Sequence, residues 1–113
     1  IAEHFGCPFY PLSEIFKLKA DGLINTTPVG MHPDILKSPV PKKVLKNYKY
    51  VMDVIYNPLN TKLLKDAAAQ GCRVFSGADM FVHQGAKQLR LWTKKEPPVT
   101  LMKKMVLERL SNL

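Results

Sequence analysis

Cysteine is scarce in this sequence, and the two residues present, Cys7 and Cys72, are too few for a disulfide scaffold. A reducing, cytoplasmic location therefore fits the composition. No apolar run approaches the ~20 residues that a bilayer span requires, and no secretory leader opens the chain. Because the first residue is Ile1 rather than methionine, we expect a cleaved or incomplete chain.

Glycine-rich and metal-binding motifs are also missing. No two of the 6 glycines lie two positions apart, which excludes a G-x-G-x-x-G phosphate loop. The 3 histidines and the cysteines lack the paired spacing of a zinc site, so we expect no metal. No G-x-S-x-G elbow occurs, and neither cysteine has an identifiable activating base. Taken alone, the chain lacks a complete catalytic constellation.

The 113 residues are 46% hydrophobic and 23% charged, which is typical of a folded domain or part of one. The formal net charge is +8, and it is concentrated after residue 40. The densest basic cluster contains Lys42, Lys43, Lys46 and Lys49. Since no aromatic stacking platform accompanies this cluster, we interpret it as a solvated face and expect no nucleic-acid partner.

Short apolar runs alternate with helical stretches along the chain. The runs that indicate strands are residues 21–25, 50–56 and 72–76. The stretches that indicate helices are residues 41–47, 61–70, 78–93 and 99–112. Such alternation is typical of parallel βαβ units. The carboxyl ends of the three strands then meet at one edge of the sheet, where ligands bind in open sheets of this kind.

Individual residues set the expected helix ends and faces. Thr61 can cap the second helix and Gly71 can stop it, while Pro41 suits the start of the first. Gly85 lies within the third helix at a cost in helix propensity, and a close helix contact or the approach of a ligand would explain why it is tolerated there. In the last helix we expect the apolar side chains to face inward: Val99, Met102, Met105, Val106 and Leu110.

The loops after the three strands resemble one known family. Residues 25–31 (N-T-T-P-V-G-M) resemble the N-A/T-T-P/S-x-G-M loop of shikimate dehydrogenases. Residues 53–61 (D-V-I-Y-N-P-L-N-T) resemble their D-x-x-Y-x-P-x-x-T segment. Residues 77–86 (G-A-D-M-F-V-H-Q-G-A), followed by Trp92, resemble their G-x-x-M-L/F-x-x-Q-x-A…F-x-x-W helix. The three matches occur in the family's order and cover about residues 20–113.

The resemblance implies an α/β fold: the C-terminal part of a Rossmann-like doubly wound parallel sheet, with about three strands and two terminal helices. It implies that residues 1–94 are the second half of an NADP-binding domain and that residues 95–113 form a helix packed on it. It also implies NADPH-dependent reduction of 3-dehydroshikimate to shikimate. The family's Gly-rich loop, its catalytic Lys–Asp pair and its N-terminal substrate domain have no counterpart here. We therefore expect an inactive fragment with no catalytic residue of its own.

The resemblance also assigns contacts to the cofactor. Main-chain groups of Val54 and Gly77 are expected at the nicotinamide end of NADP, because a glycine lets backbone approach a planar ring. Asn25, Thr26 and Thr27 either line the cofactor cleft or hold their own loop through side-chain hydrogen bonds. The sequence leaves these two alternatives open.

Two residues are assigned to the substrate, shikimate or 3-dehydroshikimate. The phenol of Tyr56 can donate to and accept from a carboxylate or hydroxyl, and the amide of Gln84 suits a neutral ring hydroxyl. Asp53 lies inside an apolar strand, and we expect it to brace nearby loops rather than do chemistry. The family pattern assigns no role to His83.

Other functions remain open at this stage. One alternative is a quinate or dual shikimate/quinate dehydrogenase, or the dehydrogenase half of a bifunctional dehydroquinate dehydratase–shikimate dehydrogenase. An alternative of another class is a non-catalytic basic module that binds nucleotides or nucleic acid, which steep salt dependence of binding would reveal.

Overall fold

Three parallel strands organise the amino-terminal two thirds of the chain. The computed structural model describes residues 1–113, and its strands are β1 (Gly22–Asn25), β2 (Tyr50–Asp53) and β3 (Arg73–Phe75), in the order β1-β2-β3. Leu23 lies beside Val51 and Val51 beside Val74 in the parallel ladders. The predicted α/β class and parallel sheet are therefore confirmed.

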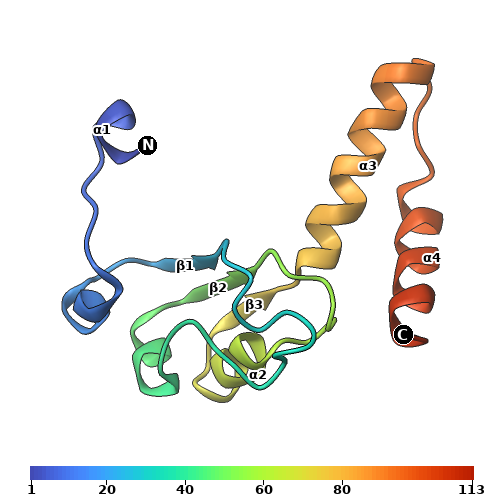
Figure 1. The fold of residues 1–113 in the computed structure, drawn as a ribbon. Helices are drawn as coiled ribbons and strands as arrows, with labels where there is room; N and C mark the ends of the chain where they lie inside the picture. The colour runs from blue at the N-terminus through green and yellow to red at the C-terminus, as the bar shows by residue number, and fades with distance from the viewer.

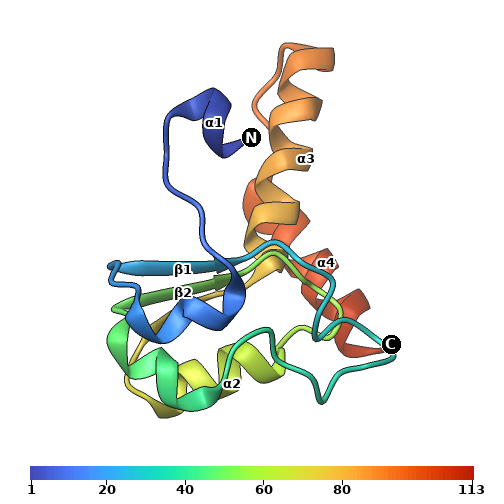
Figure 2. The ribbon, with the colours of Figure 1, turned by 60° about the vertical axis from the view of Figure 1, so that its left-hand side comes forward.

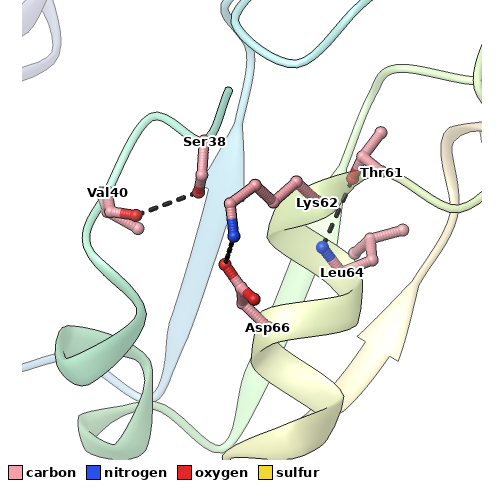
Figure 3. Close-up of polar contacts among 6 residues, drawn as sticks. All are labelled: Ser38, Val40, Thr61, Lys62, Leu64 and Asp66. Atoms are coloured by element: carbon pink, nitrogen blue, oxygen red, sulfur yellow. Dashed lines mark hydrogen bonds and ion pairs between the residues drawn. The ribbon is translucent and has the colours of Figure 1, made fainter. Parts of the chain in front are cut away.

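The helices are the short α1 (Ala2–Phe5), α2 (Lys62–Ala69), α3 (Gly77–Thr93) and α4 (Val99–Ser111). Two 3₁₀ helices, η1 (Leu12–Lys17) and η2 (Lys42–Asn47), complete the secondary structure. The helix expected at residues 41–47 is thus a 3₁₀ helix that follows Pro41. The Thr61 side chain caps α2 by accepting a hydrogen bond from Leu64 N, as predicted and as Figure 3 shows.

One face of the sheet carries the core. Helix α2 packs on β2, β3 and η2, below the strands in Figure 2. Leu45, Val51 and Ala67 are completely buried there. The core cluster comprises Ile15, Val40, Val44, Leu45, Tyr48, Val51, Leu63, Leu64, Ala67 and Cys72. Burial of this apolar surface provides the main stabilisation of the α/β unit, which we define as residues 22–75.

The α3–α4 hairpin, residues 77–111, stands away from the sheet, and its two helices lie side by side (Figure 1). They pack on each other, and neither packs extensively on a strand or on α2. The Cα radius of gyration is 16.1 Å, against roughly 13 Å for a compact domain of this length. The projecting hairpin and the amino-terminal segment account for this extended shape.

Two sequence expectations need correction. The strand expected at residues 50–56 ends at Asp53, because the Asp53 carboxylate accepts a hydrogen bond from Ile55 N and turns the chain out of the sheet. Met105, expected to face inward on α4, is 55% exposed. The other four residues of that expected face are only half-buried. The apolar pattern of α4 therefore predicts a helix correctly but not a buried face.

Candidate functional site

A pocket of about 510 Å³ lies at the carboxyl ends of β1 and β2. Four residues assigned from the sequence line it: Thr26, Thr27, Val54 and Tyr56. The other lining residues are Pro28, Met31, His32, Ile55 and Asn57. The pocket forms here because parallel strands end at the same edge, so the loops that follow them become neighbours.

The pocket wall contains no lysine, arginine, aspartate or glutamate. Its polar side chains are two threonine hydroxyls, one phenol, one imidazole and one amide. Such a wall can orient a neutral polar group or a planar ring by hydrogen bonds and apolar contact.

Asn25 does not line this pocket but holds the loop that does. Its side-chain oxygen accepts hydrogen bonds from Thr27 N at 3.1 Å and from Thr27 Oγ1 at 2.7 Å. Its Nδ2 donates to Val29 O at 3.3 Å and to Asp53 Oδ1 at 3.1 Å. Of the two interpretations that the sequence leaves open, the observed bonds favour loop stabilisation for Asn25.

Asp53 connects this loop to the neighbouring segments. It is completely buried. Its Oδ1 accepts hydrogen bonds from Asn25 Nδ2 and from Ile55 N, each at 3.1 Å, and its Oδ2 accepts one from Thr61 Oγ1 at 2.7 Å. A buried carboxylate requires such donors. The structure thus shows Asp53 bracing the loops after β1 and β2 and the start of α2, as we expected from the sequence.

Gly77 touches the backbone of the neighbouring strand end. A Cβ atom at this position would collide with the carbonyl group of Val54. The missing side chain therefore lets β3 lead into α3 while residues 54–55 pass directly against it. Val54 and Gly77, both assigned to the cofactor, are in contact, although Gly77 itself is buried and does not line the pocket.

Tyr56 connects the strand edge to the α3–α4 hairpin. Its ring packs on Phe81 of α3, with 4.8 Å between the centroids and 31° between the planes. A second, mostly apolar pocket of about 310 Å³ lies on this side of Tyr56 and reaches α4. Tyr56 thus contributes to both pockets.

Gln84 is exposed on α3 and lines neither pocket. It follows Phe81 by three residues, which places the two side chains on the same side of the helix. Tyr56 therefore contacts α3 through Phe81, and Gln84 lies one helical turn along α3 from Phe81. His83, to which the family pattern gives no role, is exposed on the same helix.

His32 and Asn57 belong to the pocket but were not identified from the sequence. His32 directly follows the first motif, and Asn57 directly follows Tyr56. The backbone N–H of His32 donates a hydrogen bond to Asn57 O at 3.3 Å, which links the two loops. The G-M-H-P and Y-N-P strings indicate turns after the strands, and these turns are the only sequence feature that points to His32 and Asn57 as pocket residues.

No group of three potential ligands is placed to hold a metal ion. No helix is long and apolar enough to cross a membrane.

Comparisons with known proteins show which family shares this sequence and this fold. Residues 77–107 match the model of the shikimate 5′-dehydrogenase C-terminal domain. A shikimate dehydrogenase (NADP(+)) of Archaeoglobus fulgidus is 42% identical over 106 residues, which cover 92% of this chain. This chain belongs to the shikimate dehydrogenase family. It spans 39% of the length of that Archaeoglobus relative.

Solved structures of the family have the same arrangement. A chorismate mutase/shikimate 5-dehydrogenase fusion protein from Clostridium acetobutylicum is 32% identical, with a TM-score of 0.88 over 97% of this chain and 42% of that one. The shikimate 5-dehydrogenase of Thermus thermophilus, solved in complex with NADP(H) and shikimate, is 34% identical. Its TM-score is 0.83 over 95% of this chain and 40% of that one. The Rossmann-like assignment of the sheet is thereby confirmed.

Proposed function

We propose that this chain supplies part of the cofactor and substrate site of a shikimate dehydrogenase, an enzyme that reduces 3-dehydroshikimate to shikimate with NADPH. The observation that carries the proposal is the pocket at the carboxyl ends of β1 and β2. Residues that match two family motifs, Thr26 and Thr27 from one and Val54 and Tyr56 from the other, line it together. The neutral wall fits the nicotinamide end of NADP, which combines a planar ring with an uncharged amide.

In this proposal the residues of the chain bind and orient. NADPH supplies a hydride when bound, and the transfer requires the ring and the substrate carbonyl at near-contact distance. The Val54–Gly77 contact fixes the backbone against which the ring would lie, while Thr26 and Thr27 line the same pocket. Tyr56 and Gln84 would bind the substrate through its carboxylate and ring hydroxyls. We assign the proton transfer to a Lys–Asp pair outside these 113 residues.

The direct experiment joins this chain to the remaining part of the Archaeoglobus relative and assays the hybrid enzyme. Tyr56→Phe and Gln84→Ala should each lower kcat/KM for shikimate by roughly tenfold, as the loss of a transition-state hydrogen bond does. The Kd for NADP should change little. Matched controls are Tyr50→Phe, at the far end of β2, and Gln88→Ala, one turn further along α3; both positions are exposed.

Unchanged kinetics in both variants would refute the substrate assignment, and a hybrid that binds no NADP would refute the function. The isolated 113-residue chain should show no shikimate oxidation, since it holds no catalytic acid or base by this proposal. Clear turnover by that chain would contradict the division of labour between the two parts.

The domain division and the location also belong to the proposal. The packing of α4 on α3 supports a terminal helix on the same unit, but the distance of the hairpin from the sheet makes residue 77 a competing boundary to residue 94. Both cysteines are free thiols, which supports a reducing cytoplasm. The absence of a nucleic-acid partner stays a prediction.

A further inference from the structure

The hydroxyl group of Thr27 has only one hydrogen-bonding capacity left. Its proton is donated to Asn25 Oδ1 at 2.7 Å, and the oxygen accepts a hydrogen bond from Val29 N at 3.3 Å. A hydroxyl group has one proton and two lone pairs. Thr27 lines the pocket, so the hydroxyl can offer a ligand a single lone pair and no proton.

The direction of the Thr27–Asn25 hydrogen bond is set by the surroundings of Asn25. The Thr27 backbone N–H also points at the Asn25 side-chain oxygen, and a donor requires an acceptor there. On the other side, Nδ2 faces the Val29 carbonyl and the Asp53 carboxylate, which are both acceptors. Turning the amide over would place donor against donor and acceptor against acceptor. All four hydrogen bonds of this buried amide are therefore made in one orientation.

Asp53 secures this orientation from behind. The carboxylate is completely buried and receives three hydrogen bonds, two of them from groups other than Asn25. It is consequently held in place by β2 and α2 independently of the loop after β1. The side chain that keeps Asn25 oriented does not itself touch the pocket.

We propose that Thr27 is a specificity-determining residue whose hydroxyl accepts a hydrogen bond from an uncharged N–H or O–H donor of the bound ligand. Asn25 is the positioning residue that makes the hydroxyl an acceptor. This inference rests on the proposed function and deepens it by stating which polarity of ligand group the cofactor loop selects. The donor belongs either to NADPH, through its carboxamide or ribose, or to a hydroxyl of the substrate.

The test uses the hybrid enzyme with three variants. Thr27→Val removes the hydroxyl at nearly constant shape and should raise the KM of one of the two substrates by about fivefold, the effect of one neutral hydrogen bond. Thr27→Ser keeps the hydroxyl and should remain within about twofold of the parent enzyme. Asn25→Ala keeps the Thr27 hydroxyl but removes the acceptor of its proton, so the hydroxyl can then donate to a ligand as well as accept. An NADPH analogue with an acetyl group in place of the carboxamide serves as the probe for the amide N–H.

A loss of preference for NADPH over the acetyl analogue in Thr27→Val and in Asn25→Ala, with rescue by Thr27→Ser, identifies the carboxamide as donor. A raised KM for NADPH with unchanged analogue preference identifies the ribose, and a raised KM for 3-dehydroshikimate identifies the substrate. Equal KM values in Thr27→Val and the parent would overturn the inference. So would equal impairment of Thr27→Ser and Thr27→Val at equal Tm. A parent hybrid that folds but binds no NADPH overturns the proposed function, and this assignment with it.

Discussion

The α/β unit and the α3–α4 hairpin use apolar residues in different ways. In the α/β unit, Leu45, Val51 and Leu63 are almost completely removed from solvent, and every buried side-chain nitrogen and oxygen has a partner. In the hairpin, α4 has no buried residue, and Trp92 is 77% exposed. Comparable apolar content therefore leads to a closed core in one region and to an open apolar surface in the other.

The difference shows what an amphipathic pattern does and does not specify. The apolar periodicity and the helix propensities of its residues are sufficient to predict α4, because both act within the segment itself. Burial requires a second surface at the right distance. Helix α2 has that surface in the strands β2 and β3, whereas α4 has only α3. Truncations of apolar side chains should consequently cost stability in the α/β unit and little in α4.

The sharpest form of this comparison uses two aspartates. Asp53→Ala leaves three buried donors without an acceptor and should lower the free energy of unfolding by about 4 kcal/mol. Asp79→Ala removes a half-exposed ion pair to Lys103 at 2.6 Å and should cost only about 0.5 kcal/mol. Urea unfolding of both variants, followed by circular dichroism, gives the two values. Equal costs would show that the Asp53 network does not stabilise the unit.

Truncating one apolar side chain in each region compares how much burial contributes to stability there. Leu45 is completely buried and Met105 is 55% exposed. Leu45→Ala should lower the free energy of unfolding by about 3 kcal/mol, because it leaves a cavity in a packed core. Met105→Ala should change it by less than about 0.5 kcal/mol. The same urea titration measures both, and a large effect at Met105 would mean that the hairpin buries this side chain against another surface.

Two glycines should respond with opposite signs. Gly77→Ala places a methyl group on the Val54 carbonyl and should destabilise the chain by about 2 kcal/mol. At Gly85 in α3, a Cβ would lie 3.6 Å from Met102 Cε, an ordinary contact. Gly85→Ala should therefore stabilise by up to about 1 kcal/mol through helix propensity. Tm measurements check both variants: a Gly77→Ala variant as stable as the parent would contradict the interpretation of Gly77, and a lower Tm for Gly85→Ala would contradict that of Gly85.

The smallest expected effect is a pH dependence that arises in the core. Burial raises the pKa of the Cys72 thiol above its ordinary value of 9.0. Above about pH 9 the unfolded chain loses this proton while the folded chain keeps it, so the thiol's contribution to stability falls as pH rises. Tyr48, whose pKa burial also raises, adds a loss of the same sign at higher pH. The Cys72→Ala variant should lose stability less steeply between pH 8 and about pH 10 than the parent.

The exposed cysteine provides the control for this experiment. Cys7→Ala retains Cys72, so its stability should fall with pH as steeply as that of the parent. A thiol reagent should modify Cys7 in the folded chain and reach Cys72 only on unfolding, because the Cys72 thiol is buried and donates to the Leu45 and Tyr48 carbonyls. Rapid labelling of Cys72 under native conditions would be inconsistent with a closed core.

Much of the candidate site could be predicted before the structure. The strand ends were located to within about three residues, and parallel strands bring their carboxyl ends together. Thr26, Thr27, Val54 and Tyr56 were therefore expected at one edge, where they line one pocket. The roles of these side chains toward cofactor and substrate stay predictions. His32 and Asn57 were missed because their placement depends on how two loops are tied to each other.

The order of strands and helices, the Thr61 cap and the end of α2 at Ala69, just before Gly71 with its φ of 85°, were determined by the sequence alone. Each depends on residues within a few positions of one another. The tertiary structure decided the early end of β2, the collision that makes Gly77 necessary, the exposure of Met105 and the polarity of the Thr27 hydroxyl. The Gly77 collision and the exposure of Met105 depend on elements that are distant in sequence. The hydrogen bonds at the end of β2 and at Thr27 are short-range, but both involve side chains that are held by the Asn25–Asp53 contact, which forms only when β1 and β2 pair. Local chemistry specifies the elements, whereas the direction of a hydrogen bond or the burial of a face requires the partner to be in place.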